Sequence, residues 1–207
     1  MTDFTIVGPI ASVFAFGDVI LHLYLDFGKA AARSEVRFQE PRFPPPSGAL
    51  ALAAYATLLA FALVLLIPAA WVLNLGDELF YMMGPIPLPS APIWMAGILV
   101  LVSGILLHGW SRFVRQEMAT SWAMSKMHKL ITSGPYSRVR HPSYLSYFLC
   151  FIGLLMVLPT LISLTLLLGF PGYYSIALAE ERHLKDHFGD EYVEYMGRTG
   201  RFLPAWP

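Results

Sequence analysis

The stretch Tyr144–Ala179 reads YLSYFLCFIGLLMVLPTLISLTLLLGFPGYYSIALA. It carries no charged residue, and it is too long for one membrane-spanning helix, which needs about 20 predominantly apolar residues. The sequence Leu158-Pro159-Thr160 interrupts it. Proline is suited to the first turn of a helix, where its missing N–H removes no hydrogen bond. We therefore predict a tight helical hairpin with spans at about 144–158 and 159–179.

Three further apolar stretches precede this hairpin, at about 4–25, 48–75 and 91–110. The chain is 56% hydrophobic and only 14% charged, whereas an ordinary soluble domain carries roughly 25% charged residues. Such an excess of apolar surface is stable only in lipid. The sequence thus predicts an all-α polytopic membrane protein, with about five transmembrane helices in a single domain over 1–207.

The basic residues predict the orientation of the chain, because cytoplasmic loops retain Lys and Arg near the ends of spans. All fourteen lie between spans one and two, between spans three and four, or after span five. This pattern places the N-terminus outside and the C-terminus in the cytoplasm. The start of the chain, MTDFTIVGPI, lacks the basic region of a secretory signal, so the first span is expected to be retained.

The first polar segment that carries candidate functional residues is His128–Tyr144, HKLITSGPYSRVRHPSY. Its Ser-Gly-Pro-Tyr sequence is typical of a turn. Arg140 and His141 then come just before the fourth span. The start of a helix offers free N–H groups and the positive end of the helix dipole, which favour a carboxylate or phosphate.

The second polar segment is Glu180–Tyr195, EERHLKDHFGDEYVEY. Helical spacing places Glu180, His183, Leu184 and His187 on one face as the fifth span leaves the membrane. Two adjacent carboxylates at this depth are costly unless cationic groups meet them. Gly189 is expected to end the helix. We expect the whole polar stretches 111–141 and 180–207 to pack on each other at the membrane surface.

Together these two segments resemble the C-terminal signature of the isoprenylcysteine carboxyl methyltransferases and the related phospholipid methyltransferases. The resemblance covers about 80 residues. It rests on an ordered set of matches: the run His128–Ile131, Gly134-x-Tyr136, the run Arg140–Tyr144, Glu180-Glu181-x-x-Leu184, and Phe188-Gly189-x-x-Tyr192-x-x-Tyr195. It implies an integral membrane enzyme that uses S-adenosylmethionine on a lipophilic or prenylated acceptor.

Carried over residue by residue, the resemblance implies a cofactor region at about 128–144 and 180–204. It implies no catalytic residue, although Arg140 and Glu181 are candidates for positioning. The residues that would line the cofactor are His128, Lys129, Leu130, Ile131, Tyr136, His141, Pro142, Ser143, Tyr144 and Glu180. Methyl transfer is an in-line displacement, so positioning and exclusion of water are expected to matter more than acid–base catalysis.

One position departs from the family pattern. The carboxyl methyltransferases carry an arginine for the acceptor's carboxylate one turn before the cofactor glutamate, and Ile176 stands here instead. Arg138, Arg140 and Arg201 are possible substitutes. The alternative is an acceptor with a neutral reacting end, which would make the protein a phospholipid N-methyltransferase or a small-thiol S-methyltransferase.

Other interpretations stay open from the sequence alone. A small membrane transporter or assembly factor would also account for the spans, with the polar segments as a docking surface. His183 and His187 are spaced as helical metal ligands are, but no third ligand is evident, and no metal is expected. Asp18 and His22 are one turn apart in the first span. They are expected either to line a substrate entrance or to pair with each other against a neighbouring helix. Membrane lipids are expected partners and nucleic acids are not.

Overall fold

The computed structural model describes residues 5–6, 8–13, 16–17, 20, 23–24, 43–87, 91–115 and 129–205. These residues are mainly helical and form no strand beyond isolated bridges. The main helices are α2 (Ser47–Val72), α3 (Gly76–Met82), α4 (Ala91–Arg115), α5 (Pro142–Val157), α7 (Gly169–Phe188) and α8 (Asp190–Arg198). The short elements η1 (Gly134–Ser137), α6 (Leu161–Leu164) and η2 (Thr165–Leu168) connect them.

Three of the described helical segments are long and apolar enough to cross a membrane: Ser47–Val72, Pro92–Arg115 and Leu161–Phe188. The helix Pro142–Val157 is apolar but shorter. The all-α membrane class predicted from the sequence is confirmed, and the chain is an integral membrane protein. The first predicted span, 4–25, is described only in part, and Asp18 and His22 lie outside the described residues.

Two helix ends differ from the predicted spans. Helix α2 ends at Val72 rather than residue 75, and the sequence continues through Asn74, whose φ is 56°, into the short helix α3. Asparagine is among the few residues that tolerate this left-handed conformation. Helix α4 runs to Arg115, five residues beyond the predicted end at Trp110. Basic side chains such as Arg112 and Arg115 are favourable in the last turn of a helix.

The hairpin within 144–179 forms, but its second helix does not begin at Pro159 as predicted. Thr160 is the N-cap instead, and helix α6 begins at Leu161. The Thr160 hydroxyl accepts a hydrogen bond from the Ser163 N–H, and the Ser163 hydroxyl accepts one from the Thr160 N–H, 3.1 Å in each case. This reciprocal capping satisfies two donors at the helix start. Pro159 cannot provide it, because proline has neither a side-chain oxygen nor a backbone N–H.

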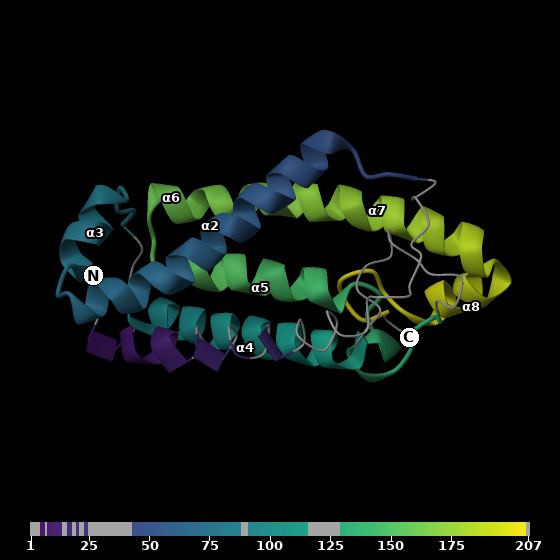
Figure 1. Ribbon diagram of the computed structural model, residues 1–207, viewed down its shortest axis with the longest axis horizontal. Coiled ribbons are helices and arrows are strands. Elements are labelled where there is room, and N and C mark those ends of the chain that lie inside the picture. The colour runs from purple at the N-terminus through teal and green to yellow at the C-terminus, as the bar shows by residue number, and fades with distance from the viewer. Residues whose placement is uncertain are drawn as a thin grey trace.

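Small residues let α4 and α5 pack closely along their length. A Cβ atom on Gly104 would lie 2.9 Å from the Ser146 carbonyl oxygen, and one on Gly153 would lie 2.6 Å from the Leu101 nitrogen. Such close backbone approach is how helices associate in a lipid environment. Figure 1 shows α4, α5 and α7 side by side, with α2 crossing α5 and α7 obliquely. The start of α5 lies beside the C-terminal half of α7, on the side of the bundle that carries α8.

Candidate cofactor site

The start of α5 is held by the segment that follows α8. The Arg140 N–H donates to the Gly200 carbonyl over 2.8 Å, and the His141 N–H donates to the Arg201 carbonyl over 3.0 Å. Pro142 is the first residue of α5, where its missing N–H removes no helical hydrogen bond. The expected packing of the polar stretches 111–141 and 180–207 on each other is thus observed in backbone hydrogen bonds.

His141 lies between the two adjacent carboxylates of α7. Its Nδ1 atom is 3.4 Å from Glu180 Oε2, and its Nε2 atom is 3.3 Å from Glu181 Oε1. All three side chains are buried. Burial alone lowers the pKa of His141, but the hydrogen bonds and charges of Glu180 and Glu181 outweigh it and raise the pKa above its ordinary value. Both acids therefore favour the protonated form of the imidazole between them.

Glu181 also accepts hydrogen bonds from two arginines. Arg140 Nε donates to Glu181 Oε1 over 2.9 Å, while Arg201 donates from Nε over 3.0 Å and from Nη2 over 2.7 Å. Arg140 further donates to the carbonyl oxygens of Met196 and Thr199. One buried carboxylate thus joins the start of α5, α7 and the segment after α8. Arg140, Arg201 and His141 are the cationic groups that the adjacent acids Glu180 and Glu181 were expected to need.

Glu180 has a different set of neighbours. The Tyr144 hydroxyl donates to Glu180 Oε1 over 2.7 Å. The rings of His141 and Tyr144 stack with centroids 5.4 Å apart and an interplanar angle of 4°. No arginine forms an ion pair with Glu180 among the described residues, so its carboxylate is held by Tyr144 and His141 and faces a hollow in the surface.

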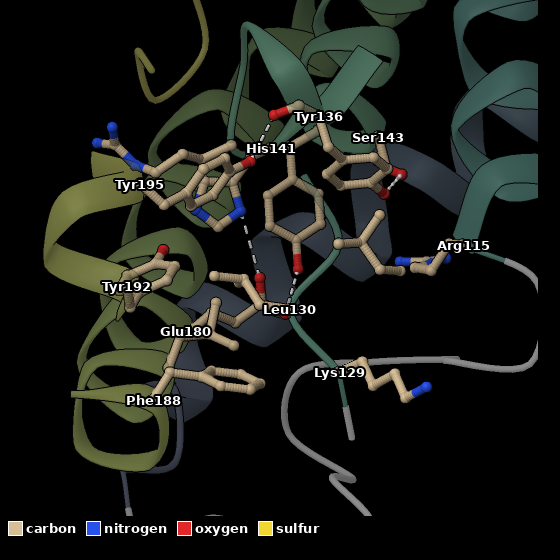
Figure 2. A pocket seen from close by; sticks show the side chains of 14 residues that line it. Arg115, Lys129, Leu130, Tyr136, His141, Ser143, Glu180, Phe188, Tyr192 and Tyr195 are labelled. Carbon is tan, nitrogen blue, oxygen red and sulfur yellow. Dashed lines mark hydrogen bonds and ion pairs between the residues drawn. The ribbon is translucent and has the colours of Figure 1, made fainter. Parts of the chain in front are cut away.

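That hollow has a volume of about 640 Å³, including space open to solvent. Figure 2 shows residues from both polar segments pointing into it, with Glu180, Phe188 and Tyr192 on one side and Arg115 and Lys129 on another. Its other lining residues are Leu130, Ile131, Tyr136, Arg140, His141, Ser143, Tyr144, Leu184 and Tyr195. It combines one acid, several cations and an aromatic and aliphatic wall.

Most of the residues that the family resemblance implied for the cofactor line this hollow: Lys129, Leu130, Ile131, Tyr136, His141, Ser143, Tyr144 and Glu180. Pro142 is buried at the start of α5 and does not line it. His128 lies outside the described residues. The structure thus brings eight of the ten together. They come from distant parts of the chain: Tyr144 and Glu180, for example, are 36 residues apart.

The sequence reasoning missed Arg115, because it placed the end of the third span at Trp110 and left Arg115 in a loop. The available signal was its spacing of seven residues from His108, which places both on one helix face. Leu184, Phe188, Tyr192 and Tyr195 belonged to the recognised signature but received no role.

The hydroxyls of Tyr192 and Tyr195 differ in their partners. Burial raises the pKa of Tyr195 to about 12, and its hydroxyl donates to the Tyr136 carbonyl over 2.7 Å. The Tyr192 hydroxyl is buried without a hydrogen-bond partner among the described residues, although the side chain lines the hollow. A buried polar atom without a partner is costly, so this hydroxyl suits a polar ligand.

A second cavity, also of about 640 Å³, lies between α2, α4 and α5. It is lined mainly by aliphatic and aromatic side chains, with Thr57, His108 and Cys150 among them. Tyr147 lines this cavity, and Tyr144, one turn earlier on α5, lines the hollow. Tyr173 packs against both rings, with centroids 4.8 Å from Tyr144 and 5.0 Å from Tyr147.

The position that departs from the family pattern is part of the core. Ile176 is only 2% exposed and belongs to the main hydrophobic cluster. Two of the three suggested substitutes, Arg140 and Arg201, are engaged by Glu181. The third, Arg138, is exposed and does not line the hollow. His183 and His187 lie on α7, and within the described residues no group of three or more His, Cys, Asp or Glu is arranged to hold a metal.

Comparison with known proteins connects this geometry to a family. Residues 93–191 match the model of the family described as phospholipid methyltransferase. The chain is 34% identical over 85 residues to the protein-S-isoprenylcysteine O-methyltransferase of Schizosaccharomyces pombe, covering 40% of this chain and 36% of that protein.

Two other relatives show the same extent of similarity. The protein-S-isoprenylcysteine O-methyltransferase B of Arabidopsis thaliana is 34% identical over 79 residues, 37% of this chain and 40% of that protein. The nickel-cobalt-cadmium resistance protein NccN of Alcaligenes xylosoxydans xylosoxydans is 35% identical over 80 residues, 38% of each chain. The matched part is less than half of each relative's length. The region that carries most of α4, all of α5 and α7, and most of the hollow is thus similar to the phospholipid methyltransferase family.

Proposed function

We propose that this protein is an integral membrane methyltransferase that uses S-adenosylmethionine to methylate a lipophilic acceptor. The observation that carries the proposal is the hollow between the start of α5 and the C-terminal half of α7, where both signature segments meet around Glu180. Most of its residues come from the region that matches the phospholipid methyltransferase family, and three relatives among those matched are named as isoprenylcysteine O-methyltransferases of yeasts and a plant.

The residues of the hollow are chemically suited to this cofactor. When bound, S-adenosylmethionine supplies a methyl group on a positively charged sulfur, which an acceptor atom takes by in-line displacement. Glu180 would hold the ammonium group, because its carboxylate has no arginine partner among the described residues. The wall formed by Leu130, Phe188 and Tyr195 would receive the adenine, and the Tyr192 hydroxyl offers the hydrogen bond that it does not make within the protein.

The protein's contribution to the reaction would be positioning and exclusion of water. Tyr144 and His141 fix the Glu180 carboxylate from the start of α5. Glu181 fixes His141 in turn and forms ion pairs with Arg140 and Arg201. Such a rigid arrangement orients the reactants without moving a proton, and correct orientation alone supplies a large part of the rate in displacements of this kind.

The second cavity supports a lipophilic acceptor. It lies within the apolar helices and is lined by residues such as Ala60, Ile105 and Leu154. The tyrosines at positions 144, 147 and 173 form a continuous group between this cavity and the hollow. An acceptor whose tail occupied the cavity would present its head towards the cofactor.

The second candidate for the methyl acceptor is a molecule whose reacting end is neutral, and Ile176 favours this candidate. This side chain is in the core and offers no charge, while Arg140 and Arg201 are both committed to Glu181. On this basis we propose phosphatidylethanolamine or a small thiol as acceptors beside a prenylcysteine. An amine would have to lose a proton, whereas a carboxylate or thiolate would not.

Two experiments test the proposal. Calorimetry on the purified protein in detergent measures binding of S-adenosylhomocysteine, which is expected. A radiolabelled methyl-transfer assay then compares a prenylcysteine, phosphatidylethanolamine and a small thiol in one membrane preparation. Absence of binding by well-folded protein would favour a transporter or assembly factor. Strong activity on prenylcysteine that survives removal of Arg138, and also of Arg201, would contradict the argument from Ile176.

A further inference from the structure

Two basic side chains line the hollow without a carboxylate partner in the described part of the chain. Arg115 is the last residue of α4, and Lys129 precedes η1. Both line the hollow. The ion pairs between described residues join Arg140, Arg201 and His141 to the glutamates of α7, and none of them includes Arg115 or Lys129. The hollow thus contains positive charge that the described acids do not neutralise.

Arg115, Tyr144 and Glu180 all line the hollow, and Tyr144 interacts with both of the others. The Tyr144 hydroxyl donates to Glu180 over 2.7 Å and also interacts electrostatically with Arg115. In Figure 2 Arg115 and Glu180 lie on different sides of the hollow. An acid and a cation therefore face the same part of the hollow.

The amino-acid end of the proposed cofactor carries an ammonium and a carboxylate on one carbon atom. A site that holds both needs an acid and a cation close to the same point. Arginine is well suited to a carboxylate, because its planar guanidinium donates two parallel hydrogen bonds to the two oxygens. We infer that Arg115, supported by Lys129, forms the subsite for the carboxylate of the cofactor's amino-acid end, opposite Glu180. This inference rests on the proposed use of S-adenosylmethionine.

Arg112 provides a matched control. It also lies in the last turn of α4, where a basic residue interacts favourably with the helix dipole. It is not among the residues that line the hollow. A variant of Arg112 therefore reports what the loss of one positive charge at this helix end does, without loss of a group that faces the hollow.

The test compares S-adenosylhomocysteine with its decarboxylated analogue, which keeps the ammonium, the sulfur and the adenosine. Affinities are measured by calorimetry for the wild type and for Arg115→Met, Arg115→Lys and Arg112→Met. Charge-assisted hydrogen bonds contribute about 1.5–3 kcal/mol, which corresponds to roughly tenfold or more in affinity. Wild type is expected to prefer S-adenosylhomocysteine by that factor, and Arg115→Met is expected to lose this preference.

The expected pattern is specific. Arg115→Met weakens S-adenosylhomocysteine roughly tenfold and leaves the decarboxylated analogue within about twofold, which also shows that the variant is folded. Arg115→Lys keeps part of the preference, and Arg112→Met keeps all of it. A loss of affinity for both ligands by the same factor would overturn the inference. So would an unchanged preference in Arg115→Met together with a raised KM for a phospholipid acceptor, because the anion would then belong to the acceptor. Failure of the wild type to bind either ligand would instead overturn the proposed function itself.

Discussion

His141 Nδ1 lies 3.4 Å from Glu180 Oε2, and the opposite nitrogen of the same ring lies 3.3 Å from the neighbouring carboxylate of Glu181. One imidazole thereby separates two acids with different tasks. Glu181 is surrounded by Arg140 and Arg201, whereas Glu180 has only Tyr144 in addition and faces the hollow. The first acid holds the fold together, and the second is presented to the proposed ligand.

Replacing Glu180 by glutamine should weaken binding of S-adenosylhomocysteine. The amide keeps the shape of the side chain and removes the charge that would attract the ammonium, so we expect a loss of roughly tenfold or more. Calorimetry in detergent measures it. Glu194→Gln is the control, because Glu194 is exposed on α8 and does not line the hollow. Equal affinities of wild type and Glu180→Gln would contradict the assignment of this acid.

Replacing Glu181 by glutamine should lower stability more than it lowers affinity. The change leaves the buried Arg140 without its charged partner, and breaking a buried ion pair from one side typically costs about 3 kcal/mol or more. Thermal unfolding in detergent, followed by tryptophan fluorescence, reports the effect. An exposed acid such as Glu194 should change stability by no more than about 0.5 kcal/mol when replaced in the same way. A melting temperature of Glu181→Gln equal to that of Glu194→Gln would show that this cluster does not hold the fold.

The contribution of His141 to stability should depend on pH. Its pKa is raised in the folded protein by Glu180 and Glu181, so folding favours the protonated ring. The stabilisation is therefore complete below the pKa of about 6.5 that a histidine has in an unfolded chain, and it is lost as the pH rises through the higher pKa of the folded state. Melting temperatures of wild type and His141→Gln, measured from pH 5.5 to 9, should accordingly converge as the pH increases. A difference that stays constant or grows over this range would contradict the bridging imidazolium.

Filling the apolar cavity should impair the acceptor without affecting the cofactor. Ala60 lines this cavity on α2, and Ala60→Leu adds three carbon atoms to it. We expect a higher KM for a lipophilic acceptor and unchanged affinity for S-adenosylhomocysteine. Ala62→Leu adds the same group on the exposed side of α2 and should leave both parameters as in the wild type. An unchanged KM in a folded Ala60→Leu variant would place the acceptor's tail elsewhere.

The start of η1 should depend on glycine at position 134. Gly134 has a φ of 59°, and a Cβ atom there would lie 2.8 Å from Val114 Cγ2. Gly134→Ala combines an unfavourable left-handed backbone with a steric clash, so we expect a loss of about 1–3 kcal/mol in stability and a misplaced Tyr136. Gly197→Ala, where no atom lies within 4 Å of the added Cβ, is the matched control. Equal melting temperatures for the two variants would contradict this account.

The hairpin and the end of α7 could be read largely from local sequence. Apolar length alone predicts that 144–179 crosses the membrane twice, and Gly189, with a φ of 56°, ends α7 as expected. The start of α6 could not be predicted from Pro159, because the reciprocal hydrogen bonds of Thr160 and Ser163 decide it. The extent of α4 was also underestimated, since a helix that leaves the membrane can continue as a polar helix through Arg115.

The sequence by itself determined that this chain enters the membrane and predicted which two polar segments form the candidate site, because apolar length and motif spacing are local properties. Only the tertiary structure decided how the two glutamates divide their tasks. They are neighbours in the chain and chemically identical, so no local pattern distinguishes them. Their partners come from the start of α5 and from the segment after α8, and contacts between such distant segments exist only once the helices have packed.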